Sequence, residues 1–117
     1  MALSASVVSG LRRLLGPAGV VLTPEGRLTY ESDMLTLYKA APDAVALPTS
    51  TEEVQAVVRL CREARVPIVP RGSGTGLIGG ATAPQGGVMV AMTRMTQILE
   101  VDLANRCATV QPGLINL

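Results

Sequence analysis

Apolar residues recur at helical spacing in two segments of the chain. The first, residues 3–15, is followed by Gly16-Pro17, a pair that ends a helix. The second begins after Ser50, which has the spacing of a capping box with Glu53, and continues to about Arg65. Two amphipathic helices are therefore predicted, with apolar stripes made of Leu3, Val7, Leu11, Leu14 and Leu15 in the first and of Val54, Val57, Val58, Cys61 and Ala64 in the second.

Short apolar runs bounded by proline, glycine or polar residues predict the strands. These runs are residues 44–47, 66–70, 88–92, 98–102 and 107–111, with a further short extended run at 20–23. Residues 24–26 predict a turn, and residues 27–40 predict a loop that leads into a short helix. A strand, a helix and a strand are thus followed by several strands in succession, which predicts an α+β or mixed α/β fold.

Length and composition narrow the possible functions. A chain of 117 residues suits one domain, and its net charge of +1 with only two tyrosines as aromatic residues argues against nucleic-acid binding. Without histidine, the chain has no Ser-His-Asp or Cys-His catalytic set and lacks the commonest metal ligand, so no metal site is expected. No apolar run reaches the roughly 18 residues that span a bilayer, so no transmembrane segment is expected.

The cysteines and the N-terminal residues provide evidence about the cellular compartment of the protein. Cys61 and Cys107 form no CxxC pair, so we interpret them as free thiols and expect a cytoplasmic protein. Cys61 belongs to the apolar stripe of the second helix, which favours a small core residue over a reactive thiol. The basic, serine-containing N-terminus faintly resembles an organelle transit peptide, but an amphipathic helix is the favoured interpretation.

A glycine-rich loop follows the apolar run 66–70 and is the segment richest in candidate chemistry. It reads Arg-Gly-Ser-Gly-Thr-Gly-Leu-Ile-Gly-Gly-Ala from Arg71 to Ala81. Glycines leave backbone N–H groups uncovered and allow positive φ, so consecutive amides can converge on an anion. Ser73 and Thr75 add hydroxyl donors, and Arg71 adds a positive charge at the rim. The loop is therefore suited to a phosphate or pyrophosphate; the alternative is a flexible loop or a tight chain reversal.

Residues 74–79 also fit the GxGxxG pattern of Rossmann dinucleotide-binding folds. That interpretation requires the loop to open a helix whose N-terminus faces the pyrophosphate. Pro84 and the Gly86-Gly87 pair would not sustain such a helix, and no Walker motif follows. Loop amides rather than a helix dipole are therefore expected to hold the phosphate, and an NAD(P)-binding Rossmann-like module is the alternative.

Several further motifs occur in an informative order. They are Tyr30-Glu31-Ser32-Asp33, Pro42-Asp43-Ala44-Val45, Pro48, Ser50 to Val54, Val66 to Leu77, Gly79-Gly80, Met92 to Met95, Ile98 to Asp102 and Val110 to Gly113. In this order they resemble FAD-linked oxidases of the vanillyl-alcohol-oxidase (PCMH-type) superfamily, with the glycolate oxidase FAD subunit and the D-lactate dehydrogenases as the nearest members. The run 48–80 is the specific part of the resemblance.

The resemblance implies a PCMH-type FAD-binding domain of the α+β class, built from a small mixed sheet with flanking helices. It also implies that the glycine-rich loop wraps the FAD pyrophosphate with backbone amides. The residues that would contact the cofactor are Arg71, Gly72, Ser73, Gly74, Thr75, Gly76, Gly80 and Ala81. Some relatives attach their flavin to a histidine at the position of Thr75, and because this chain has no histidine, noncovalent FAD is expected.

The same resemblance implies how the domain is organised. Residues 1–43 would form an N-terminal helix and connecting segment, and residues 44–117 the first lobe of the FAD-binding domain. The second lobe and a substrate-binding cap are expected beyond Leu117. The parent enzyme would oxidise a small 2-hydroxy acid of the glycolate or D-lactate type by hydride transfer to the flavin, with other oxidase subunits as partners.

The chain itself holds no persuasive catalytic residue. Asp33, Glu100 and Asp102 are interpreted as caps or solvated charges, so little or no turnover is expected from the chain alone. A lobe without its counterpart would expose strand edges and apolar surface. Self-association is therefore expected, and a non-catalytic partner domain is a further alternative.

Overall fold

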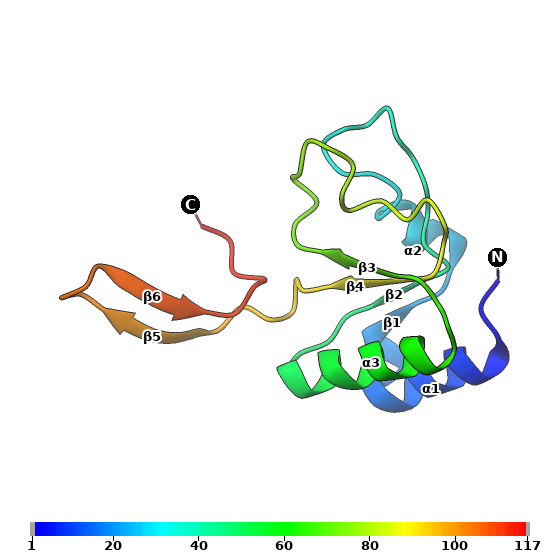
Figure 1. Ribbon diagram of the computed structural model, residues 1–117, viewed down its shortest axis with the longest axis horizontal. Helices are drawn as coiled ribbons and strands as arrows, with labels where there is room; N and C mark the ends of the chain where they lie inside the picture. The colour runs from blue at the N-terminus through cyan, green and yellow to red at the C-terminus, as the bar shows by residue number, and fades with distance from the viewer. Residues whose placement is uncertain (1, 117) are drawn as a thin grey trace.

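A computed structural model describes residues 2–116 of the chain. Figure 1 shows two helices beneath a small sheet, long loops above it, and a two-stranded hairpin that projects from one end. In chain order the elements are α1 (Ala5–Leu15), the 3-10 turn η1 (Pro17–Gly19), β1 (Val20–Val21), α2 (Pro24–Leu28), β2 (Ala44–Ala46), α3 (Thr51–Glu63), β3 (Ile68–Arg71), β4 (Val88–Ala91), β5 (Ile98–Asp102) and β6 (Cys107–Val110).

The main sheet has four strands in the order β1-β2-β4-β3. Strands β2, β4 and β3 run parallel, with Met89 opposite both Val45 and Val69, and β1 pairs with β2 in the antiparallel sense. Every residue of β2 and β4 is buried, because α1 and α3 cover one face and loops cover the other. This two-sided burial explains why the runs 44–47 and 88–92 are continuously apolar rather than alternating.

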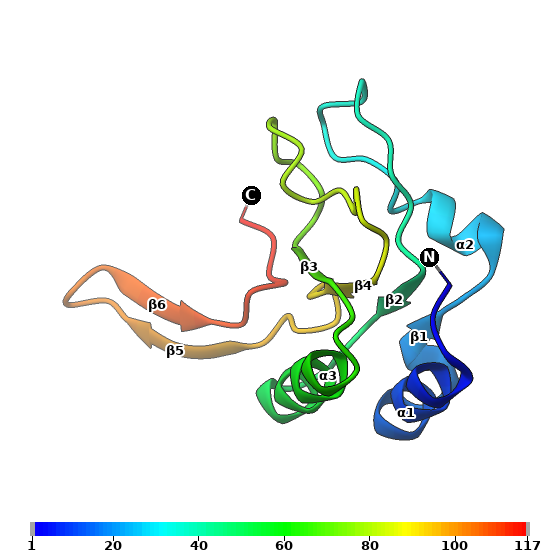
Figure 2. The same cartoon turned by 45° about the vertical axis from the view of Figure 1, so that its right-hand side comes forward.

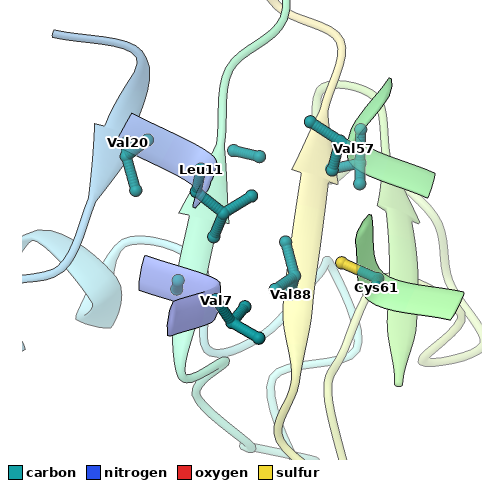
Figure 3. Packing of buried hydrophobic residues seen from close by; sticks show 9 residues of the cluster. Val7, Leu11, Val20, Val57, Cys61 and Val88 are labelled. Atoms are coloured by element: carbon teal, nitrogen blue, oxygen red, sulfur yellow. The ribbon is translucent and has the colours of Figure 1, made fainter. Parts of the chain in front are cut away.

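The core lies between the sheet and the helix pair. Val7 and Leu11 from α1 and Val57 and Cys61 from α3 point toward Val88 of β4, as Figure 3 shows, and all five are at most 2% exposed. Burying an aliphatic side chain of this size stabilises a fold by roughly 1.5–3 kcal/mol. The interpretation of Cys61 as a core residue is confirmed.

The two predicted stripes are wider than the buried faces. Leu14 and Val58 are 38% and 40% exposed, so these members of the stripes lie outside the core. The two helices also pack on each other, as Figure 2 shows, and Leu14 lines the open groove between them. The fully covered part of each stripe is narrow: Val7, Gly10 and Leu11 are buried in α1, and Val57 and Cys61 in α3.

Both long helices begin at a serine cap. Ser4 Oγ accepts a hydrogen bond from the N–H of Val7 at 3.4 Å, and Ser50 Oγ accepts one from Glu53 at 3.2 Å. The carboxylate of Glu53 returns to the N–H of Thr49 at 2.7 Å, one residue before the position of an ideal capping box. The predicted start of the second helix is therefore confirmed.

The segment between β1 and β2 differs from the prediction. Residues 24–26 form the first turn of helix α2 instead of an isolated turn, because Thr23 caps the N–H of Gly26 at 3.2 Å and Pro24 suits the first helical position. Residues 29–43 contain no helix, so the short helix expected within residues 27–40 is also wrong. This segment instead runs over the sheet as a loop (Figure 1).

Strands β3, β4, β5 and β6 lie within one or two residues of the predicted runs. The α+β class with a small mixed sheet and flanking helices is confirmed. The boundary between residues 1–43 and 44–117 stays a prediction, although β1 from the first segment joins the sheet of the second. No helix within residues 2–116 is long and apolar enough to cross a membrane.

The hairpin of β5 and β6 stands apart from the sheet in both views (Figures 1 and 2). It accounts for the elongated shape, 50 Å along the longest axis against 22 Å along the shortest. All four residues of β6 and most of β5 are exposed, and a register shift separates Ile98 from Glu100. Both faces and both edges of this hairpin are therefore open to solvent.

Candidate functional site

The glycine-rich loop connects β3 to β4 and rises above the carboxyl end of β3. Residues 72–87 contain no helix and no strand. The Rossmann interpretation fails here, because its loop must open a helix directly after the glycines. Any anion at this loop therefore meets backbone amides without a helix dipole behind them.

The backbone amides of this loop are unused by the protein. Within residues 2–116, no N–H group from residue 72 to residue 81 donates a hydrogen bond to another protein atom. Most of these residues are exposed, so their donors face solvent rather than a buried void. Free N–H groups in a loop this rich in glycine are donors available to phosphate oxygens.

Two glycines in the loop have backbone conformations that other residues rarely adopt. Gly74 and Gly79 have φ angles of 74° and 77°. A Cβ atom at Gly74 would also collide with the guanidinium of Arg71, lying 2.6 Å from its Cζ. At Gly72 and Gly80, by contrast, a Cβ atom would meet nothing within 4 Å and would project into open space.

A cavity of about 290 Å³ lies against this loop. All eight residues predicted to contact the cofactor line it, together with residues that the sequence interpretation left out. The lining residues are Asp33, Pro70, Arg71, Gly72, Ser73, Gly74, Thr75, Gly76, Ile78, Gly80 and Ala81. The structure therefore brings the predicted residues together around one space, and their contact with a cofactor stays a prediction.

Arg71 holds the loop in place. Its Nη1 donates to the carbonyl oxygens of Ser32 at 2.9 Å and Ala81 at 3.2 Å, and its guanidinium lies 5.4 Å from the ring centre of Tyr30. One side chain thus joins the start of the loop, its end and the segment that precedes β2. The charge expected at the rim is half-buried and already engaged by backbone carbonyls.

Asp33 is the one charged residue among the cavity-lining residues that the sequence interpretation left out, the others being Pro70 and Ile78. Its side chain is only 5% exposed, and Oδ1 accepts a hydrogen bond from the N–H of Leu35 at 2.8 Å. The cap interpretation is therefore correct for Oδ1, while the alternative of a solvated charge is wrong. The only sequence signal for its place at the loop was its membership of the Tyr30–Asp33 motif.

The remaining candidates lie away from the loop. Asp102 accepts hydrogen bonds from the N–H and Nδ2 of Asn105 at 3.0 and 2.7 Å in the hairpin turn, which lowers its pKa. Cys61 is buried and Cys107 is exposed, and neither is in a disulfide. Across residues 2–116, no group of three or more Cys, Asp and Glu side chains could hold a metal ion.

The loop fits the pyrophosphate of a dinucleotide on three counts. Its amides are free, its glycines at positions 72 and 80 leave the approach unobstructed, and a cavity lies beside them. The conformation is fixed from outside by Arg71 and by the N–H of Met34, which donates to the carbonyl oxygen of Gly76 at 3.0 Å. A preformed loop of this kind orders few additional groups when an anion binds.

Comparison with known proteins agrees with this geometry. The family described as FAD binding domain matches residues 42–116. The chain is 46% identical over 107 residues to the glycolate oxidase subunit GlcD of Bacillus subtilis, and 41% identical over 112 residues to that of Escherichia coli K12. It is 40% identical over 102 residues to a D-lactate dehydrogenase of Anaerostipes hadrus. These matches cover 92%, 96% and 86% of this chain but only 22–23% of each relative, so the chain spans less than a quarter of their length.

Solved structures share the fold. An alkyldihydroxyacetonephosphate synthase superimposes with a TM-score of 0.83 at 27% identity, covering 96% of this chain and 25% of that one. A p-cresol methylhydroxylase (PCMH) with bound substrate superimposes with a TM-score of 0.80 at 31% identity, covering 93% and 22%. With a family match over more than half of its length and a fold shared with these enzymes, the chain belongs to the family of PCMH-type FAD-binding domains.

Proposed function

We propose that this chain is the FAD-binding portion of a flavin-dependent oxidoreductase that oxidises a small 2-hydroxy acid. The observation that carries the proposal is the run of free N–H groups from residue 72 to residue 81, in a chain of the FAD-binding family. The substrate class rests on the relatives, whose names include glycolate oxidase, D-lactate dehydrogenase and D-2-hydroxyglutarate dehydrogenase. Glycolate, D-lactate and D-2-hydroxyglutarate share a carboxylate with a hydroxyl on the adjacent carbon.

In this proposal the loop backbone binds the FAD pyrophosphate. Donors come from the amides of Gly72 to Gly76, and Gly80 and Ala81 close the other side of the cavity. Arg71 keeps these two stretches at a fixed separation and contributes positive charge. Bound FAD would supply the hydride acceptor, whereas this chain's own residues bind and orient it.

Further parts of the proposal concern the complete enzyme. Noncovalent FAD is part of the proposal for this portion of the enzyme, because its 117 residues include no histidine for a linkage. The protein is cytoplasmic and works with other oxidase subunits, in keeping with the name of the GlcD relatives as subunits. Residues 44–117 form the first lobe of the flavin domain, and residues 1–43 contribute its N-terminal helix.

The cofactor is tested by titrating the purified chain with FAD, following flavin fluorescence, with NADH as the control ligand. We expect saturable binding of FAD, with higher affinity than for NADH, which shares the pyrophosphate but lacks the flavin. Gly72→Val should abolish binding without unfolding the chain, because its side chain would point into the open approach to the loop. Gly16→Ala is the matched control: it strains a glycine with φ of 74° at the end of α1, so it should lower stability and leave FAD binding intact. Tighter binding of NADH than of FAD, or equal FAD binding by Gly72→Val, would contradict the proposal.

The reaction is tested on the parent enzyme with an artificial electron acceptor. We expect turnover of glycolate or D-lactate, with L-lactate as the stereochemical control, and little or no turnover by the 117-residue chain alone. Full activity in the isolated chain would contradict its assignment as a cofactor-binding portion.

A further inference from the structure

Asp33 has a carboxylate oxygen that lacks a hydrogen-bond donor. The side chain is 5% exposed, and its Oδ1 is bonded to the N–H of Leu35 at 2.8 Å. Its Oδ2 is fully buried, and no donor within residues 2–116 reaches it. An unpaired buried carboxylate oxygen is costly, so a donor from outside residues 2–116 is expected to pair with it.

This oxygen faces the glycine-rich loop. Asp33 lines the cavity at the loop, and its Oδ2 lies 3.6 Å from the position of a Cβ atom at Gly76. The residues on either side of Asp33 are fixed to the loop and its strand, Ser32 through Arg71 and Met34 through Gly76. The backbone on either side of Asp33 is therefore held against the loop and its strand, and Oδ2 lies buried beside Gly76 at the wall of the cavity.

The chemistry of Asp33 differs from that of the rest of the cavity. The loop presents N–H groups and the hydroxyls of Ser73 and Thr75, all of which can donate to phosphate oxygens. An ionised carboxylate only accepts, and it repels phosphate. In a dinucleotide, hydroxyl groups of the ribose and of the ribityl chain flank the pyrophosphate. Such a hydroxyl can donate a hydrogen bond to Oδ2 while the phosphate oxygens stay away from the carboxylate.

We propose that Asp33 is a cofactor-positioning residue whose Oδ2 accepts a hydrogen bond from a hydroxyl group beside the pyrophosphate. The inference rests on the proposed function, in which the loop binds the pyrophosphate of FAD. Attraction to a hydroxyl on one side and repulsion of phosphate on the other set the position of the dinucleotide along the loop. Because Oδ2 has no exposed surface in the free protein, the loop beside it at Gly76 must shift for the hydroxyl to reach it, and the oxygen is then satisfied in the complex.

The test is Asp33→Asn, which keeps an oxygen for the N–H of Leu35 and replaces Oδ2 by a group that cannot accept. FAD affinity should fall by about tenfold or more, the loss expected for a hydrogen bond to a charged group. The melting temperature of the ligand-free variant should stay the same or rise, because an unpaired buried charge has been removed. Competition by ADP and by FMN then assigns the hydroxyl, since only the half-ligand that supplies it should lose affinity in the variant.

Glu31→Gln is the matched control. It removes a carboxylate from the same segment, one that pairs with Lys39 at the surface at 3.5 Å, and should leave FAD affinity unchanged. Equal or tighter FAD binding by Asp33→Asn would overturn this inference but leave the proposed function standing. A parallel loss of FAD affinity and melting temperature, or a failure to fold, would do the same by assigning Asp33 a structural role. A wild-type chain that does not bind FAD would overturn the proposed function, and this inference with it.

Discussion

Arg71 donates a hydrogen bond to the carbonyl oxygen of Ser32 at 2.9 Å, although the two residues are 39 positions apart in the chain. The same nitrogen also donates to Ala81, at the far end of the glycine-rich loop. The loop's shape therefore depends on a segment that precedes β2. A cluster of glycines, which alone would be flexible, is in this way given one conformation.

Replacing Arg71 should affect the loop before any ligand is added. Arg71→Ala removes the donor to Ser32 and Ala81 and the contact with Tyr30, and should destabilise the fold by about 1–3 kcal/mol. Arg71→Lys should recover only part of this, because an ammonium group lacks the planar fork of a guanidinium. Thermal and urea unfolding of the ligand-free variants measure the effect. An unchanged stability in both variants would mean that Arg71 acts only as a charge toward a ligand.

The helix and strand predictions succeeded where the signal is local. The cap at Ser50, the apolar runs of β4 and β5 and the glycine-rich loop all follow from residues within a few positions of one another. Helix α2 was missed because Pro24 and Gly26 are typical of turns, and the cap at Thr23 decides between the two. The exposure of Leu14 and Val58 depends on how α1 and α3 share the sheet, which no local pattern records.

The candidate site, like the helices and strands, was predictable from the sequence only where its signal is local. Its eight proposed contact residues are nearly contiguous, and dense glycine after an apolar strand is a strong local signal. Asp33 and Ser32 reach the loop only through the tertiary fold. From sequence, an aspartate in a polar segment is most simply interpreted as a cap, and Asp33 is one through Oδ1. That its other oxygen is buried against Gly76 required the structure.

The two cysteines should differ sharply in reactivity. Cys61 is fully buried in the core, and burial raises the pKa of its thiol above the ordinary value of 9.0, whereas Cys107 is exposed in β6. A thiol reagent at pH 7.5 should therefore modify Cys107 quickly and Cys61 only when the chain unfolds. Mass spectrometry of the peptides after short labelling measures this. Equal labelling of both sites in the folded chain would contradict the packing of α3 on the sheet.

The raised pKa of Cys61 also has a consequence for stability at alkaline pH. The folded state favours the protonated thiol. The contribution of Cys61 to the free energy of unfolding is therefore fully present below pH 9.0, the ordinary pKa of the unfolded thiol. It declines as the pH rises above that value toward the raised pKa of the folded state. Cys61→Ala should be less stable at neutral pH, and the difference from the wild type should narrow above pH 9.0. A difference that stays constant with pH, measured by urea unfolding, would contradict this.

The serine cap of α3 should contribute measurably to folding. Ser50→Ala removes the acceptor for the N–H of Glu53 and should cost about 1 kcal/mol, the usual value for an N-cap. Ser9→Ala is the control, because Ser9 is an exposed serine within α1. Urea unfolding of the two variants gives the comparison. A loss in Ser50→Ala no larger than in Ser9→Ala would mean that the bond from Glu53 is not maintained in solution.

The hairpin should make the chain self-associate. Leu99, Val101 and Leu103 are 59%, 61% and 85% exposed, and a two-stranded hairpin is marginally stable by itself in water. With both edges unpaired and a net charge of only +1, little opposes contact between copies. Sedimentation velocity over a range of concentrations should therefore detect species larger than a monomer.

Two variants that add the same charge test whether association depends on the apolar face of the hairpin, which includes Val101 and Ala108, or on the hairpin as a whole. Val101→Lys puts a charge on the face that Val101 shares with Ala108 and should weaken the association. Thr109→Lys adds the same charge opposite Glu100, on the other face, where an oppositely charged cross-strand pair forms, and should change it less. If both variants weaken association equally, the open edges rather than the apolar face hold the copies together. A wild-type chain that sediments as a monomer at every concentration would show that the exposed hairpin is stable without a partner.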